Sequence, residues 1–162
     1  MSQLDWGTRH LLLVPKDRVE DFQIDDAAAQ RWQMADVAEG LPQVYAATSE
    51  TFVAQMLNLD LLGAIAFDKG CYLGQEVVLR GTFRGQMQKG LVQLALPPGA
   101  GPGAVLRAGE QEVGVVTSAA DTPEGRLGLG YLRRAHWKEG ARLATTGGEA
   151  VVRRVLVTER DG

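Results

Sequence analysis

One short segment of the chain gathers the residue types that chemistry requires. Residues 68–80 read DKGCYLGQEVVLR, with a thiol and a phenol side by side between two glycines. Cys71 follows Lys69 by two positions and precedes a predicted helix over residues 75–82, whose first turn contains Glu76. A neighbouring ammonium group and a helix N-terminus both lower the pKa of a thiol and raise its thiolate fraction. The spacing therefore predicts a reactive thiol at Cys71.

The same segment continues into a basic flank. Arg80, Arg84 and Lys89 follow the thiol, and guanidinium and ammonium groups can hold a carboxylate or a phosphate. A structural interpretation stands beside this functional one. A lone cysteine is often a small buried hydrophobe, the two glycines can mark only a tight turn, and Glu76 can serve only to start the helix.

The elements that position this segment differ on its two sides. After Lys89, apolar runs of four to eight residues alternate with Gly- and Pro-containing turns. Short strands at this spacing are typical of a small antiparallel sandwich or barrel. The predicted strands lie in the runs 91–96, 104–109, 112–119, 126–132, 141–147 and 150–157. We place a domain boundary near residue 87, with an α/β region over residues 1–87 and a β-domain over 88–162.

The first half predicts mixed structure. Residues 9–14, RHLLLV, form an apolar run before Pro15 that predicts a buried strand. Asp25 and Asp26 can cap a helix that ends at Gly40. Residues 49–62 predict a short helix and an apolar loop. The fold class is therefore α+β.

Composition excludes several classes of protein. The 162 residues are 45% hydrophobic and 23% charged, as in an ordinary globular domain, and the formal net charge of −3 does not favour nucleic-acid binding. No apolar run is long enough for a membrane span, and the N-terminus lacks the pattern of a secretory signal. One cysteine cannot form an internal disulfide, and with two distant histidines it predicts no structural metal site. These features together predict a cytoplasmic protein.

The signature around the thiol resembles that of a known family. Residues 69–76 match the K-G-C-Y-x-G-Q-E pattern of the YgfZ/Iba57 family, folate-binding proteins of iron–sulfur cluster assembly and repair that are related in fold to the glycine cleavage T-protein, an aminomethyltransferase. All seven fixed positions match, namely Lys69, Gly70, Cys71, Tyr72, Gly74, Gln75 and Glu76. Residues 40–42, 56–60 and 112–118 resemble further stretches of the same family. The T-protein relatives have no cysteine at the signature position, so the resemblance favours the iron–sulfur branch.

This resemblance implies a fold, a cofactor and roles for residues. It implies a partial T-protein-like α/β region followed by a small antiparallel β-barrel, with tetrahydrofolate as cofactor and Cys71 as the catalytic or sensing group. The implied cofactor-binding residues are Lys69, Tyr72, Gln75, Glu76 and Arg80. Family members usually carry an additional N-terminal domain that shapes the folate cavity, so we expect weak or absent folate binding by this chain alone.

The predicted function is a tetrahydrofolate-linked accessory factor in iron–sulfur cluster assembly or repair. Two alternatives stay open, a folate-dependent aminomethyltransferase and a folate-independent protein-binding module. The predicted partners are folate and iron–sulfur client or assembly proteins, with no nucleic acid and no membrane. We also expect a homodimer, or a second chain that supplies the N-terminal domain, because apolar surface is left to cover. The residues predicted to form that surface are Phe52, Leu57, Leu59, Leu61 and Leu62.

Overall fold

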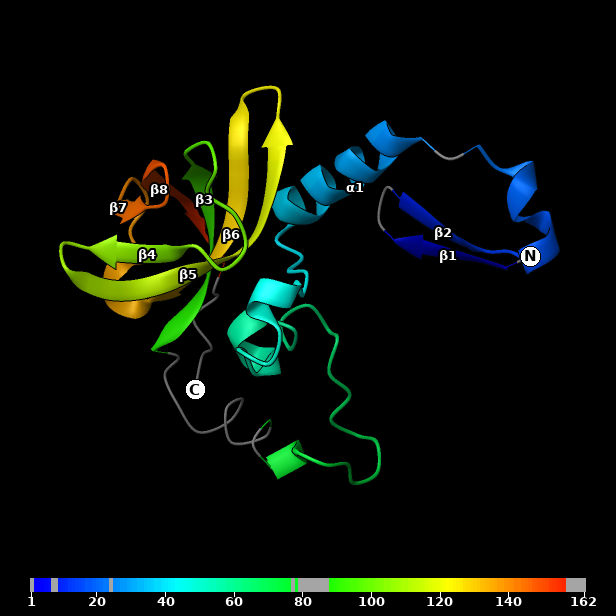
Figure 1. Ribbon diagram of the computed structural model, residues 1–162. Helices are drawn as coiled ribbons and strands as arrows, with labels where there is room; N and C mark the ends of the chain where they lie inside the picture. The colour runs from blue at the N-terminus through cyan, green and yellow to red at the C-terminus, as the bar shows by residue number, and fades with distance from the viewer. Residues whose placement is uncertain (1, 7–8, 24, 77, 79–87, 157–162) are drawn as a thin grey trace.

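The molecule is an α+β structure whose C-terminal half is a closed barrel (Figure 1). The computed structural model describes residues 2–6, 9–23, 25–76, 78 and 88–156. Six antiparallel strands close the barrel in the order β3-β6-β5-β4-β7-β8. They are β3 (Lys89–Leu96), β4 (Val105–Ala108), β5 (Gln111–Thr122), β6 (Gly125–Arg133), β7 (Arg142–Thr145) and β8 (Gly148–Val155). All six predicted strands therefore form, and the predicted fold class is confirmed. The predicted domain boundary near residue 87 lies outside the described residues.

The barrel interior is filled by alternating apolar side chains of its strands. The residues of this cluster are fully or almost fully buried. The largest of them are Val92, Leu94, Leu96, Leu106, Val113, Val116, Leu132, Leu143 and Val152. Close strand contact requires glycine at Gly114, because a Cβ there would overlap the carbonyl oxygen of Tyr131 on β6. This core is local to residues after 88, so the barrel does not depend on the N-terminal elements for its interior.

Helix α1 (Asp26–Glu39) covers part of the outer face of the barrel. Its N-cap is Asp25, whose carboxylate accepts a hydrogen bond from the Ala27 backbone N–H at 2.9 Å. Gly40 ends the helix in the left-handed conformation, at φ 79°. Both predicted helix ends are thus confirmed. Val37 of α1 is buried in a second apolar cluster with Leu91 and Leu129 of the barrel.

The connection between helix and barrel is built from short 3-10 turns. These are η2 (Ala46–Thr48) and η3 (Ala54–Leu57), while η1 (Lys16–Asp21) precedes α1 and η4 (Arg134–His136) follows β6. Leu57 of η3 joins the second apolar cluster, and Phe52 packs edge-on to Tyr131, with 5.2 Å between ring centroids. The predicted short helix within residues 49–62 is therefore one 3-10 turn packed on the barrel.

A two-stranded hairpin, β1 (Ser2–Trp6) and β2 (Arg9–Leu13), begins the chain. It extends away from the barrel, and its Arg9 bonds to Trp32, Asp36 and Glu39 in the second half of α1 (Figure 1). The strand predicted at residues 9–14 forms, but the prediction that it is buried is wrong. Leu11, Leu12 and Leu13 are 41%, 41% and 56% exposed, because α1 holds the hairpin away from both apolar clusters. Among the described residues, no helix is long and apolar enough to cross a membrane.

Candidate functional site: an exposed thiol loop

The segment that carries the thiol is a loop between η3 and the first barrel strand. In Figure 1 it is the green trace that runs out from η3. Cys71 is exposed to solvent, so the interpretation of this cysteine as a buried hydrophobe is wrong. Lys69 and Glu76 are also exposed, while Tyr72 and Gln75 are half-buried. The thiol is therefore accessible to a protein partner or a small reactant.

A small set of contacts shapes the loop around the thiol. The Lys69 ammonium lies over the Tyr72 ring, 4.8 Å from its centroid, which is within the range of a cation–π contact. The Tyr72 backbone N–H donates to Gln75 Oε1 at 3.3 Å, and the Gln75 backbone N–H donates back to the Tyr72 carbonyl at 3.2 Å. These reciprocal bonds close a turn directly after Cys71. Lys69, Tyr72 and Gln75 thus act together to hold the loop.

Gly74 allows this turn to continue into a helical start. Its φ of 86° lies in the left-handed region, which glycine adopts without steric cost. Gln75, Glu76 and Val78 are helical, and the Val78 N–H donates to the Gly74 carbonyl at 3.2 Å. The start of the predicted helix is therefore present. The remainder of that helix, including Arg80, lies outside the described residues, as does Arg84 of the basic flank that follows it.

Gln55 anchors the loop from η3, and the sequence reasoning did not identify it. Its side chain is buried, at 3% exposed, and its Nε2 donates to the Val78 carbonyl. The sequence did carry a signal for this contact, because Gln55 stands inside the apolar run 52–62. An amide buried in such a run requires a hydrogen-bond partner. Gln55 thus connects the helical start after Cys71 to the body of the molecule.

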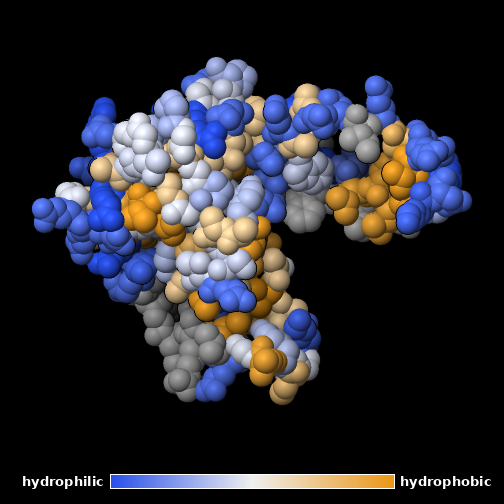
Figure 2. Space-filling view, in the orientation of Figure 1, coloured by the Kyte–Doolittle hydropathy of each residue, from blue (hydrophilic) through white to orange (hydrophobic). Residues whose placement is uncertain are grey.

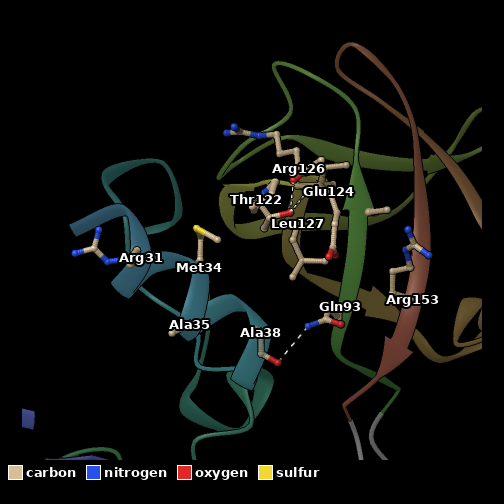
Figure 3. A pocket seen from close by; sticks show the side chains of 14 residues that line it. Arg31, Met34, Ala35, Ala38, Gln93, Thr122, Glu124, Arg126, Leu127 and Arg153 are labelled. Carbon is tan, nitrogen blue, oxygen red and sulfur yellow. Dashed lines mark hydrogen bonds between the residues drawn. The ribbon is translucent and has the colours of Figure 1, made fainter. Parts of the chain in front are cut away.

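A separate groove lies between α1 and the long hairpin formed by β5 and β6 (Figure 3). Its volume is about 870 Å³, and it presents Arg31, Arg126 and Arg153 around an apolar floor that includes Met34 and Leu127. Two of these guanidinium groups already have anionic partners. Arg31 pairs with Asp25 at 3.0 Å, and Arg126 pairs with Asp121 at 2.6 Å. None of the predicted site residues lines this groove.

The described loop does not form an enclosing site for tetrahydrofolate. A pocket for a ligand of this size normally buries most of the ligand surface, whereas Lys69, Cys71 and Glu76 are all exposed. The structure brings Lys69, Tyr72 and Gln75 together beside Cys71, but as a surface turn. In the described part of the chain, no group of three or more His, Cys, Asp or Glu side chains could hold a metal ion.

The C-terminal half of the chain is similar to a known domain. Residues 86–156 match the family model described as the CAF17 C-terminal β-barrel domain. The barrel is thus similar to that domain, in agreement with the resemblance to the YgfZ/Iba57 family carried by the signature at residues 69–76.

One solved structure similar to this chain is the glycine cleavage system aminomethyltransferase T from Bartonella henselae. The two are 30% identical, with a TM-score of 0.40 over 51% of this chain. The matched region spans 25% of that aminomethyltransferase.

Proposed function

We propose that this chain is a tetrahydrofolate-linked accessory factor in iron–sulfur cluster assembly or repair in the cytoplasm, with Cys71 as its reactive or sensing group. The observation that carries the proposal is the exposed thiol at the centre of the K-G-C-Y-x-G-Q-E signature. The CAF17-type barrel at residues 86–156 supports the same family assignment.

The chemistry of the loop is consistent with this role. A thiolate is both a nucleophile and a ligand for soft metal ions, and an exposed thiol can reach a client protein without a change of fold. Lys69 and Gln75 each contact Tyr72, and these contacts leave Cys71 accessible to solvent. The loop therefore presents the thiol directly before a hydrogen-bonded turn.

Folate would require additional walls around this loop. The described residues leave the exposed thiol uncovered, so a second chain or a further domain would have to complete the cavity. In that arrangement Lys69, Tyr72, Gln75 and Glu76 would line one side of the cavity. Arg80, the remaining residue implied to bind folate, lies outside the described residues.

The test is complementation of iron–sulfur enzyme activities in cells that lack the native factor. We expect Cys71→Ser to lose complementation while the melting temperature stays unchanged, because the side chain is exposed. Leu73→Ser is the matched control, because Leu73 is fully exposed and lies two residues from Cys71. We expect this variant to complement. Full complementation by Cys71→Ser would refute the proposal.

The aminomethyltransferase alternative predicts a different product. It requires formation of methylene-tetrahydrofolate from an aminomethyl-lipoyl carrier protein, which the iron–sulfur proposal does not. A protein-binding module without folate predicts complementation that persists when folate synthesis is blocked. These two assays therefore separate the three functions.

A further inference from the structure

The N-terminal hairpin leaves apolar surface uncovered. The sequence predicts such surface at Phe52, Leu57 and Leu59, but the structure packs these three residues against the barrel. Leu61 and Leu62 are 40% exposed. A larger uncovered apolar surface lies on β2, in three consecutive leucines that are 41–56% exposed. Figure 2 shows hydrophobic colour at this end of the molecule, far from the barrel.

The leucines lie on both faces of the two-stranded sheet. Side chains alternate along a strand, so Arg9, Leu11 and Leu13 share one face and Leu12 lies on the opposite face. Strands that are apolar on both faces are typical of sheets covered on both sides. Arg9 donates hydrogen bonds to α1, whereas the three leucines stay partly exposed.

The edge of β2 is also open to pairing. Its register with β1 runs from Ser2–Leu13 to Trp6–Arg9, and the described residues place no strand on its other edge. Proteins usually protect such an edge with lysine, proline or an exposed charge. Here the one permanently charged residue, Arg9, has its side chain only 10% exposed and paired with Asp36 and Glu39. The described strand therefore presents no exposed permanent charge against the addition of another strand.

A two-stranded sheet is marginally stable in water, and a third strand with an apolar face is normally needed. The free edge is self-compatible, since residues 10–13 carry no acidic or permanently charged side chain. In an antiparallel pairing of two copies centred on Leu11, His10 lies opposite Leu12, and Arg9 lies opposite Leu13. No like charges face each other across that pair.

We propose that the β2 edge is an interface at which two copies of this chain pair about a two-fold axis. The product is a four-stranded antiparallel sheet in the order β1-β2-β2-β1, with the leucines of both copies packed together. A closed two-fold interface uses the same patch on both copies. The paired strands are five residues long, so the interface is small, and we expect a dimer that depends on protein concentration.

Sedimentation velocity of the 162-residue chain over a range of micromolar concentrations tests the interface. We expect a concentration-dependent dimer that Leu12→Lys converts to a monomer, because a lysine would place like charges close together across the two-fold pair. Val44→Lys is the matched control and should leave the dimer intact, since Val44 is 67% exposed outside the hairpin. A chain that stays monomeric throughout, or a dimer that survives Leu12→Lys, would overturn the proposal.

Cross-linking covers the case in which Leu12→Lys disturbs the hairpin itself. Leu11→Cys in a Cys71→Ser background should form a disulfide-linked dimer under mild oxidation, because directly opposed Cβ atoms lie about 4.5–5.5 Å apart. Val19→Cys, also exposed but outside the strand, should not. Failure of Leu11→Cys to cross-link at concentrations where the parent chain is dimeric would overturn the two-fold pairing.

Discussion

The guanidinium of Arg9 forms a 2.6 Å ion pair with the buried carboxylate of Asp36 and thereby ties the N-terminal hairpin to α1. The same guanidinium contacts Glu39 at 2.7 Å and lies 4.4 Å from the centroid of the Trp32 ring. Burial opposes the charge on Arg9, but the hydrogen bonds to Asp36 and Glu39 outweigh it and raise the pKa of Arg9. Arg9 is thus fully charged wherever the hairpin is docked.

Asp36 continues this connection toward the barrel. Its second oxygen accepts a hydrogen bond from Gln43 Nε2 at 2.9 Å, and the Gln43 backbone N–H donates to Ser118 Oγ of β5 at 3.1 Å. A continuous set of polar contacts therefore runs from β2 through α1 to the barrel wall.

Replacing Arg9 by alanine should release the hairpin from α1. Breaking a buried ion pair costs about 3–5 kcal/mol. This cost is large compared with the stability of a two-stranded sheet, which is marginal in water. We expect hydrogen exchange of the β1 and β2 amides to accelerate strongly while the barrel amides stay protected. Arg18→Ala is the control, because the Arg18–Asp21 pair is more than half exposed and such pairs contribute little. Retained protection of the hairpin in Arg9→Ala would contradict this role.

The N-cap of α1 should make the helix sensitive to acid. The hydrogen bond from Arg31, followed by that from the Ala27 N–H, lowers the pKa of Asp25 below its usual 3.8. A lowered folded-state pKa means that the stabilisation is complete above pH 3.8 and is lost as pH falls through the lower value. Hydrogen exchange of the first turn of α1 against pH should show this loss. Asp25→Asn keeps the oxygen that caps the helix but removes the carboxyl group that titrates. In this variant the hydrogen exchange of the first turn should no longer show this dependence on pH.

Gly114 should not accept a side chain unless the barrel wall shifts. An alanine Cβ there would overlap the Tyr131 carbonyl oxygen and lie 3.1 Å from Leu132 Cα, so the strand pair must shift. We expect Gly114→Ala to lower the free energy of unfolding by about 1–3 kcal/mol, as for other overpacked sites. Gly70→Ala should be nearly neutral in thermal denaturation, because a Cβ at that position would meet no heavy atom within 4 Å.

The Tyr72–Gln75 turn should order the loop beside the thiol. Gln75→Ala removes the acceptor of the Tyr72 N–H, and we expect faster exchange of that amide in nuclear magnetic resonance. Gln75→Glu retains an acceptor oxygen and should preserve most of the protection. Equal exchange rates in the two variants would show that the side-chain bond does not hold the turn.

Folate binding by the chain alone should be weak or absent. Of the residues implied to bind it, Lys69 and Glu76 are exposed and Tyr72 and Gln75 are only half-buried, and the groove beside α1 contains none of them. Isothermal titration calorimetry with tetrahydrofolate should detect no sub-micromolar binding. A tight, stoichiometric complex would contradict the expectation that further walls are needed.

The barrel and α1 could be predicted from sequence because their signals are local. Alternating apolar runs between turn residues determine the six strands, and Asp25 and Gly40 determine the two helix ends. The thiol segment was identifiable for the same reason, since all seven signature residues lie within eight positions.

Only the tertiary structure decided which apolar residues are buried and how the loop is held. Leu12 and Leu57 look alike in sequence, yet one is 41% exposed and the other 6%, because the 3-10 turn places Leu57 on the barrel while α1 holds β2 away from it. Gln55 anchors Val78 across 23 residues, and Arg9 reaches Asp36 across 27. Such contacts depend on the path of the chain in space, and residue spacing along the sequence carries no information about that path.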